Sequence, residues 1–182
     1  MARKGRSQVI ADLIASRGWT RGAELGVYEG QTLFYLLERF PKLTMFGVDH
    51  WKRTGGTIQN RDTGEAPYAN KPMEKIRDKV FCEGLRYGKR CRLLEMSTVI
   101  AAAFVPNGSL DFVFVDADHS TDAVTGDIQV WYPKLKPTGA LLGHDVNWPS
   151  VQRALEVTLD HWIELDANVW FHDLEVAHPD QA

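Results

Sequence analysis

One six-residue segment, Leu110–Val115, limits the folds open to this chain more than any other part of its sequence. It reads LDFVFV, so five of its six residues are apolar, and a Pro-Asn-Gly turn at 106–108 precedes it. A strand that is apolar on both faces is typical of the interior of a parallel sheet, because helices cover both faces of such a sheet. The sequence therefore predicts an α/β protein with this segment as a central strand.

Strand and helix patterns alternate on both sides of that segment. Strands are predicted at 22–26, 44–49, 92–94, 110–115, 140–143, 163–165 and 169–175, and helices at 7–18, 30–40, 72–85, 98–104, 121–135 and 149–161. This alternation is typical of βαβ units and predicts a doubly wound, Rossmann-like, mostly parallel seven-stranded sheet. The three residues between the last two strands are too few for a parallel crossover, so the last strand is expected to be antiparallel.

The length and composition indicate one soluble domain spanning residues 1–182. The chain is 44% hydrophobic and 25% charged, as in an ordinary globular protein. Its sequence has neither an apolar run long enough for a membrane helix nor the apolar core of a signal peptide. The two cysteines lack the spacing of a metal site and suit a reducing cytoplasm, which we expect as the location.

The charge is distributed unevenly along the chain. Residues 71–92 hold eight basic and three acidic side chains, whereas residues 109–182 hold three basic and thirteen acidic ones. The basic stretch lacks interleaved aromatic residues and is interpreted as a solvated helix face. The acidic second half argues against nucleic acid as a partner.

A long polar loop interrupts the alternation at residues 52–71. It is rich in Gly, Asn and Asp, and a loop of this length inside a compact domain is usually either a functional lid or disordered. Both interpretations stay open, and as a lid the loop would close over a substrate.

A glycine turn and an acidic residue follow the first two predicted strands. Ligands of doubly wound sheets bind beyond the carboxyl ends of the strands. Gly26 and Gly30 allow close approach of a ligand to the turn between the first strand and its helix. Asp49 ends the second strand, where a carboxylate can accept hydrogen bonds from two ribose hydroxyls. The pattern lacks the third glycine of dinucleotide-binding oxidoreductases, so it favours another nucleoside cofactor over NAD.

Two later strand ends carry a cluster of acids and histidines. Asp116 and His119 follow the central strand, and His144 and Asp145 follow the fifth strand. Carboxylates that converge from neighbouring strands suit a divalent cation. A histidine near its working pH suits a general base. Asp118 is interpreted as a helix cap.

Together, these residues resemble the class I S-adenosylmethionine-dependent methyltransferases, over roughly residues 21–146. The resemblance rests on the Glu-Leu-Gly-x-x-x-Gly turn, the acid after the second strand, and the block from Val113 to Asp145. That block is similar to small-molecule O-methyltransferases that modify sugars of macrolides. The resemblance implies cofactor contacts for Glu24, Gly26, Gly30, Thr32, Asp49, Met96, Ser97 and Asp116. It also implies that His119, together with Asp116, acts in catalysis.

The metal-binding branch of this family implies a cation at Asp116 and Asp145. His144 occupies the position of a third, usually acidic, ligand. Imidazole suits manganese, zinc or iron better than magnesium. The alternatives of a different metal, a weakened site and no metal therefore all stay open.

The expected activity is methyl transfer from S-adenosylmethionine to a hydroxyl of a small, sugar-like or natural-product acceptor, with no membrane partner. Two alternatives are an inactive cofactor-binding accessory protein and a methyltransferase for another class of acceptor. Because the cofactor fold takes nearly the whole chain, acceptor specificity is expected from the N-terminal helix, the 52–71 loop, the strand ends or a neighbouring subunit of a homo-oligomer.

Overall fold

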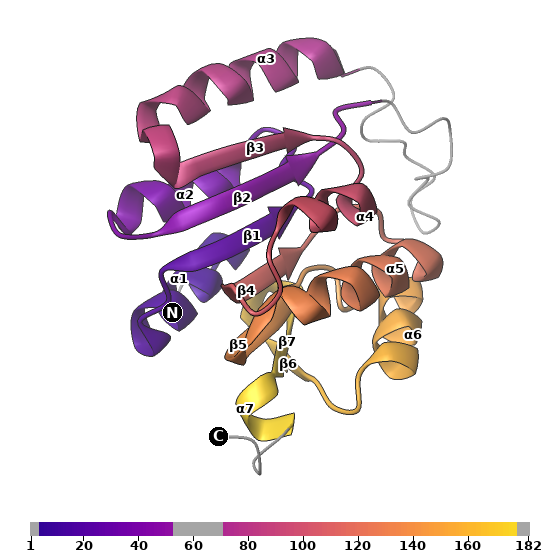
Figure 1. Cartoon of the computed structure of the whole chain (residues 1–182). Coiled ribbons are helices and arrows are strands. Elements are labelled where there is room, and N and C mark those ends of the chain that lie inside the picture. Colours follow the sequence, from indigo (N-terminus) through magenta and orange to yellow (C-terminus); the bar gives the residue numbers. More distant parts are fainter. Residues whose placement is uncertain (1–3, 53–70, 178–182) are drawn as a thin grey trace.

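In the computed structural model, which describes residues 4–52 and 71–177, strands and helices alternate as the sequence predicts (Figure 1). The strands are β1 (Arg21–Leu25), β2 (Thr44–Asp49), β3 (Cys91–Glu95), β4 (Leu110–Val115), β5 (Leu135–Gly143), β6 (Ile163–Leu165) and β7 (Val169–Asp173). The α-helices are α1 (Arg6–Arg17), α2 (Gln31–Arg39), α3 (Met73–Gly84), α4 (Thr98–Ala101), α5 (Thr121–Trp131), α6 (Pro149–Thr158) and α7 (Leu174–Ala177). The predicted lid at 52–71 lies almost entirely outside the described residues.

The strands form one seven-stranded sheet in the order β3-β2-β1-β4-β5-β7-β6. The first five strands pair in parallel, and β7 runs antiparallel to both of its neighbours, β5 and β6. The predicted seven-stranded, mostly parallel, doubly wound sheet with an antiparallel last strand is confirmed. The carboxyl ends of the five parallel strands lie at one edge of the sheet.

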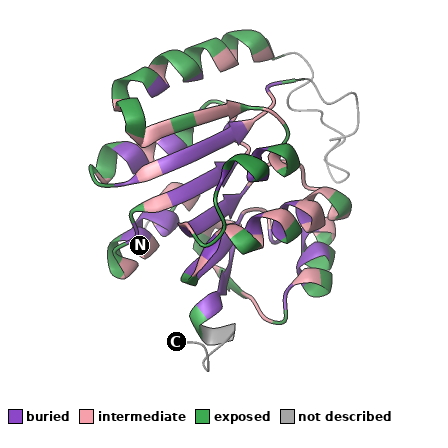
Figure 2. Cartoon of the chain, in the orientation of Figure 1, coloured by how far each residue is buried: buried purple, intermediate pink, exposed green. Residues whose placement is uncertain are grey.

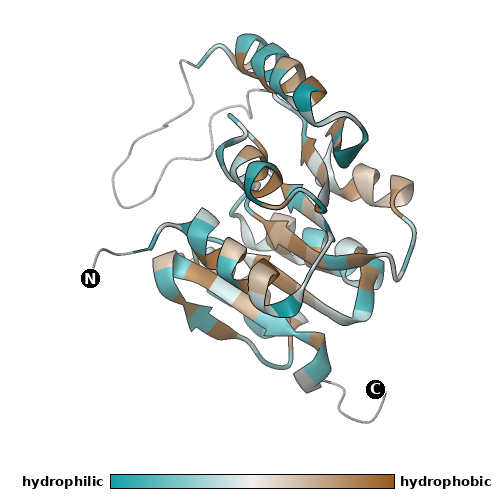
Figure 3. Ribbon diagram, turned by 90° about the vertical axis from the view of Figure 1, so that its left-hand side faces the viewer, coloured by the Kyte–Doolittle hydropathy of each residue, from teal (hydrophilic) through white to brown (hydrophobic). Residues whose placement is uncertain are grey.

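Helices cover both faces of the sheet, as the apolar central strand requires. Buried residues of α1, α2 and α3 pack on one face, and buried residues of α4, α5 and α6 pack on the other. Figure 2 shows buried residues concentrated along the central strands, whereas α3 at the top is mostly exposed. Hydrophobic and hydrophilic stretches alternate around that helix in Figure 3, so only one of its sides contributes to the core.

Asp111, the one charged residue of the central strand, has partners at the start of β1 and on β5. Its carboxylate accepts hydrogen bonds from the backbone N–H groups of Thr20 and Arg21 at 2.8 and 2.9 Å, and from the Lys136 ammonium. Burial alone would raise the pKa of Asp111, but the hydrogen bonds outweigh it and lower the pKa. The charge in the strand is therefore compatible with its buried position.

Strand β5 begins five residues earlier than the sequence pattern predicts. The predicted strand covers only 140–143, but β5 also runs through 137–139, and its pairing with β4 shifts between Leu110 and Phe112. Such an irregularity accommodates a proline that cannot donate a ladder hydrogen bond. Four other elements end two or more residues earlier than predicted: α4 at Ala101, α5 at Trp131, α6 at Thr158 and β7 at Asp173.

Candidate active site

The register of the sheet brings the predicted strand-end residues to one edge. Leu25 of β1 is paired with Val48 of β2 and with Val115 of β4, and Val115 is paired with Gly143 of β5. The residues that follow these four positions therefore lie side by side in space. All the site residues that the sequence predicts come from this edge or from the adjoining start of α2.

The turn after β1 depends on two glycines. Gly26 has φ +90° and Gly30 has φ +78°, a conformation that favours glycine. A Cβ on Gly26 would lie 2.2 Å from the backbone oxygen of Asp116. The β1 turn and the end of β4 are thus in direct backbone contact, and the turn leaves the start of α2 open to a ligand.

Asp49 at the end of β2 holds the glycine turn in place. Its carboxylate accepts hydrogen bonds from the backbone N–H groups of Tyr28 at 2.8 Å and Trp51 at 2.7 Å. Both of these residues have positive φ angles, of 49° and 42°, and the Trp51 indole N–H donates to the Tyr28 carbonyl at 2.9 Å. Each carboxylate oxygen has a second lone pair, so the group can still accept from a ligand.

Glu24 on β1 is a buried acid below the turn. Its side chain is 2% exposed, and Oε2 has no hydrogen-bond partner among the described residues. Burial raises the pKa of Glu24 well above its usual value, and the charge of Asp116 raises it further. An unpaired buried carboxyl oxygen is costly, so a cationic or hydrogen-bonding ligand would stabilise it.

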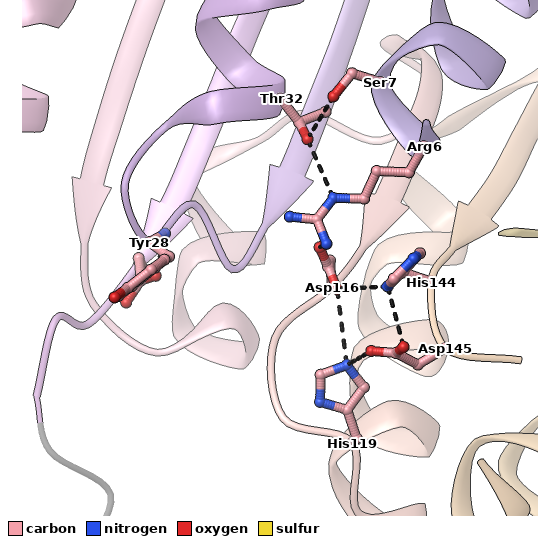
Figure 4. A network of polar contacts seen from close by, with 9 residues as sticks. Arg6, Ser7, Tyr28, Thr32, Asp116, His119, His144 and Asp145 are labelled. Carbon is pink, nitrogen blue, oxygen red and sulfur yellow. Dashed lines mark hydrogen bonds and ion pairs between the residues drawn. The ribbon is translucent and has the colours of Figure 1, made fainter. Parts of the chain in front are cut away.

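Arg6 reaches from the start of α1 into the space between α2 and β4 (Figure 4). Its guanidinium lies 3.3 Å from Oδ2 of Asp116, and its Nε donates to the hydroxyl of the buried Thr32 at 3.4 Å. The Thr32 hydroxyl also contacts the hydroxyl of Ser7 at 3.1 Å. Thr32, predicted to contact the cofactor, therefore lies beside a positive charge that sequence reasoning did not assign.

The acids and histidines predicted at the ends of β4 and β5 converge into one cluster (Figure 4). Nε2 of His119 lies 2.7 Å from Oδ2 of Asp145 and 3.7 Å from Oδ1 of Asp116. Nδ1 of His144 lies 3.2 Å from Asp145 and 3.7 Å from Asp116. One donor atom each from Asp116, His144 and Asp145 lies within 4.8 Å of those of the other two. The three predicted metal ligands are thus near one another.

The charges in this cluster are strongly coupled. Burial lowers the pKa of His119, but the carboxylates of Asp116 and Asp145 outweigh it and raise the pKa to about 9. Burial would raise the pKa of Asp145, yet His119 and His144 hold it well below its usual range. Below about pH 9 the cluster therefore holds His119 mainly as an imidazolium, next to a carboxylate that stays ionised.

Several buried nitrogen atoms of the cluster lack hydrogen bonds. Nδ1 of His119 has no hydrogen-bond partner among the described residues, whereas Nε2 of His119 and Nδ1 of His144 contact the carboxylates as ion pairs that lack hydrogen-bond alignment. Asp145 has a φ of +56°, so the backbone is strained where its carboxylate is presented. Unpaired donors and strain of this kind are expected where a site is completed by a ligand.

Met96 and Ser97 follow β3 at the same edge. The Met96 backbone N–H donates to the Asp49 carbonyl at 3.1 Å, and its side chain packs against the core. The Ser97 hydroxyl accepts from the N–H of Ile100 at 3.3 Å and caps α4. Met96 is thus half-buried at the edge where its cofactor contact is predicted, whereas the Ser97 hydroxyl has a structural partner. Asp118, predicted as a cap, accepts from the Ser120 N–H at 2.7 Å, and Ser120 is the N-cap of α5.

Sequence reasoning missed three residues of the site. Arg6 lies about twenty residues before the glycine turn, and its basic neighbours gave no reason to single it out. Trp51 closes against the turn, and Trp148 lies against His119 with ring centroids 4.9 Å apart. Both tryptophans follow strand ends, Trp51 after β2 and Trp148 after β5, and this position was the sequence signal that could have identified them.

A comparison with known protein families establishes the family of this chain. The sequence profile of a family described as a methyltransferase domain matches residues 23–146. The chain belongs to this methyltransferase family. The match covers the glycine turn and the whole Asp–His cluster, so the resemblance to class I S-adenosylmethionine-dependent methyltransferases is confirmed. A comparison with curated proteins finds no match.

Solved structures share the fold of this methyltransferase at low sequence identity. Cofactor-bound Rv0187 from MTB is 13% identical, with a TM-score of 0.68 over 96% of this chain and 82% of that chain. A putative caffeoyl-CoA O-methyltransferase from Staphylococcus aureus is 11% identical, with a TM-score of 0.67 over 94% and 83%. The SAH-bound methyltransferase PaMTH1 from Podospora anserina is 16% identical, with a TM-score of 0.65 over 94% and 78%.

These comparisons and the fold identify the methyltransferase as dependent on S-adenosylmethionine. Among the described residues, no helix combines the length and the apolar character that crossing a membrane requires.

Proposed function

We propose that this methyltransferase transfers the methyl group of S-adenosylmethionine to a hydroxyl of a small, polyhydroxylated acceptor, with a divalent cation beside the acceptor oxygen. The observation that carries the proposal is the convergence of Asp116, His119, His144 and Asp145 next to the glycine turn. A base and carboxylates at the edge of the cofactor pocket suit an acceptor that must lose a proton.

The charges beside the turn fit the methionine part of S-adenosylmethionine, which carries both an ammonium and a carboxylate. The ammonium suits the carboxyl groups of Glu24 and Asp116, one of which has an unpaired buried oxygen. The carboxylate suits the Arg6 guanidinium beside Thr32 at the start of α2. Asp49 at the neighbouring strand end suits the ribose hydroxyls.

The cation-binding residues would be Asp116, His144 and Asp145, whose mixed nitrogen and oxygen donors suit manganese, zinc or iron better than magnesium. A bound cation would stabilise the negative charge that develops on the acceptor oxygen. The mixed nitrogen and oxygen donors therefore support manganese, zinc or iron as the cation at this site.

The chain's own residues would align the reactants and take the proton. The neutral form of His119, which is populated as the pH approaches its pKa of about 9, would take the proton of the acceptor hydroxyl. The acceptor oxygen forms the bond to the methyl carbon, and the sulfur keeps the electron pair of the broken bond. Asp145, 2.7 Å from Nε2 of His119, stabilises the imidazolium that forms. Trp148 lies against the ring and limits its movement.

A methyl-transfer assay with a panel of polyhydroxylated and phenolic acceptors tests the proposal, measured as S-adenosylhomocysteine release with and without a chelator. We expect turnover with at least one hydroxyl acceptor and a loss on chelation that manganese restores. Release only with amine or thiol acceptors would contradict the proposed acceptor class. Cofactor binding without release for any acceptor would favour the inactive accessory protein.

Calorimetry with S-adenosylmethionine tests the cofactor site separately. Asp49→Ala removes the proposed ribose contact and is expected to weaken binding about 10-fold or more, as expected for hydrogen bonds to a charged group. Asp78→Ala, which changes an exposed carboxylate on α3, is the matched control. Equal affinities of the two variants would contradict the ribose contact.

A further inference from the structure

Three large apolar side chains are exposed together on one short helical segment. Val99, Ile100 and Phe104, here named the α4 patch, are 50%, 61% and 60% exposed. They lie on α4 and on the 3-10 helix η2 (Ala102–Phe104) that continues it. The other exposed large apolar side chains among the described residues are spread over α3 and the turn after it, α6 and β6. Exposed apolar residues that gather at one place indicate a surface for interaction.

The α4 patch lies on the side of the helix that faces away from the core. Ile100 and Phe104 are four residues apart, so they are neighbours on one side of the helix, with Val99 beside Ile100. Ala101 and Ala102 are buried and pack into the core, whereas Figure 2 shows α4 with an exposed outer surface. The exposed side chains therefore contribute little to folding, and their apolar character requires another explanation.

The helix that carries the patch is held in a fixed position. The Ser97 hydroxyl caps its first turn. The indole N–H of the fully buried Trp131 donates to the Thr98 carbonyl at 3.0 Å. A surface that is already ordered in this way loses little conformational freedom when it binds a partner.

The patch and its surroundings in the sequence are uncharged. Residues 96–110 read MSTVIAAAFVPNGSL and hold no charged side chain, although 25% of the whole chain is charged. In a dimer with two-fold symmetry the same surface of both copies meets, so a surface of one charge sign would repel its copy. An uncharged apolar patch has no such penalty. This favours a second copy of the chain as the partner.

Side chains of opposite charge flank the patch. Figure 1 shows α4 between β3 and α5. On the β3 side, the exposed Arg92 lies over the Phe46 ring, 5.6 Å from its centroid. On the α5 side, Asp122 of the first turn is exposed. A two-fold axis that crosses the patch between these flanks places the basic flank of each copy against the acidic flank of the other, which is a complementary arrangement.

We propose that Val99, Ile100 and Phe104 form the centre of an interface between two copies of this chain, related by a two-fold axis. Phe104 is the aromatic anchor, the kind of residue that contributes most to binding at the centre of an interface. The charged flanks form the polar rim. The proposal concerns association alone and does not rest on the proposed methyl transfer.

Sedimentation velocity of the whole chain over a series of concentrations tests the interface. We expect a dimer that dissociates on dilution. Ile100→Glu places a carboxylate from each copy in the apolar centre and is expected to raise the dissociation constant of the dimer about 100-fold. Leu85→Glu is the matched control, because Leu85 is 80% exposed and lies on another element. It is expected to leave the dissociation constant unchanged.

A monomer at every protein concentration up to about 100 μM would overturn the proposal, since interfaces of ordinary size have dissociation constants in the micromolar range or below. A dimer that is equally stable in the Ile100→Glu and Leu85→Glu variants would overturn it as well. If circular dichroism shows that the Ile100 variant does not fold, Phe104→Ser, which removes the aromatic anchor, decides instead by the same loss or its absence.

Discussion

Two groups of the same residue types lie in different surroundings. The Asp116–Asp145 cluster comprises Asp116, His119, His144 and Asp145, and the Asp160–His172 group comprises Asp160, His161 and His172, of which His172 is on β7. The first is at the carboxyl edge of the parallel strands, beside a glycine turn, an arginine and a strained aspartate. The second lies on a covered face of the sheet, and its rings are oriented by one carbonyl and one carboxylate. The difference teaches that residue type alone does not define a site, because only the first group lies next to a pocket suited to the cofactor.

The sharpest test of this difference is the base in the first group. His119→Ala is expected to lower kcat about 10²–10⁴-fold, since it removes the proposed acceptor of the hydroxyl proton. The dissociation constant of S-adenosylmethionine should change little, because the cofactor pocket is otherwise intact. Steady-state kinetics and calorimetry measure the two quantities. A kcat within a few-fold of the original would exclude His119 as the base, and the first group would then have no catalytic role that distinguishes it from the second.

The close backbone contact at the first site gives the second test. Gly26→Ala should lower the free energy of unfolding by about 3 kcal/mol or more, because the Cβ meets the Asp116 carbonyl and φ is positive. Gly18→Ala is the matched control, since Gly18 has φ +66° but open space around a Cβ. We expect a loss of only about 1 kcal/mol there. Urea unfolding measures both, and equal losses would show that the contact is not tight.

Asp127 is a buried acid on α5, one of the helices that cover the sheet face with the second group. Burial raises its pKa from 3.8 to about 6 in the folded protein. A raised folded pKa contributes stability that is complete below pH 3.8 and lost as the pH rises through about 6. Asp127→Asn should therefore raise the free energy of unfolding at pH 8 by up to about 3 kcal/mol and change it little at pH 3. A gain that does not depend on pH would contradict this ionisation.

The smallest expected effect concerns Arg6, whose guanidinium lies 3.3 Å from Asp116 in the first group. Arg6→Ala should weaken S-adenosylmethionine binding about 10-fold, and Arg6→Lys should weaken it less, since lysine keeps the charge without the planar guanidinium. Lys4→Ala is the control, because Lys4 pairs with Asp12 at 2.7 Å on the same end of α1. Calorimetry measures the affinities. Equal affinities for the Arg6 and Lys4 alanine variants would show that Arg6 of α1 does not contribute to cofactor binding.

The fold could be predicted because its signals are local. The apolar run of β4, the glycine turn and the regular spacing of helices each indicate a parallel sheet without knowledge of distant contacts. The start of β5 could not be predicted, because Pro137 and Gly139 read as a turn and the strand continues through them only by the irregular pairing with β4.

The candidate site was predictable to the same extent. Asp49, Asp116 and Asp145 follow strand ends, and the sheet topology alone brings such positions together. Arg6 could not be predicted, because its contact with Asp116 spans 110 residues and depends on how α1 packs. The Asp160–His172 group was missed for a similar reason, since only the antiparallel return of β7 brings His172 back to His161.

The missing side chain of Gly26 has a mechanical consequence. The turn that would hold the methyl donor and the strand end that would hold the acceptor machinery touch through backbone atoms alone. Side chains change rotamer within nanoseconds, but a backbone contact in a paired sheet has no such freedom. The spacing between donor and acceptor is therefore set by the sheet itself, and a change at position 26 would displace both halves of the reaction at once.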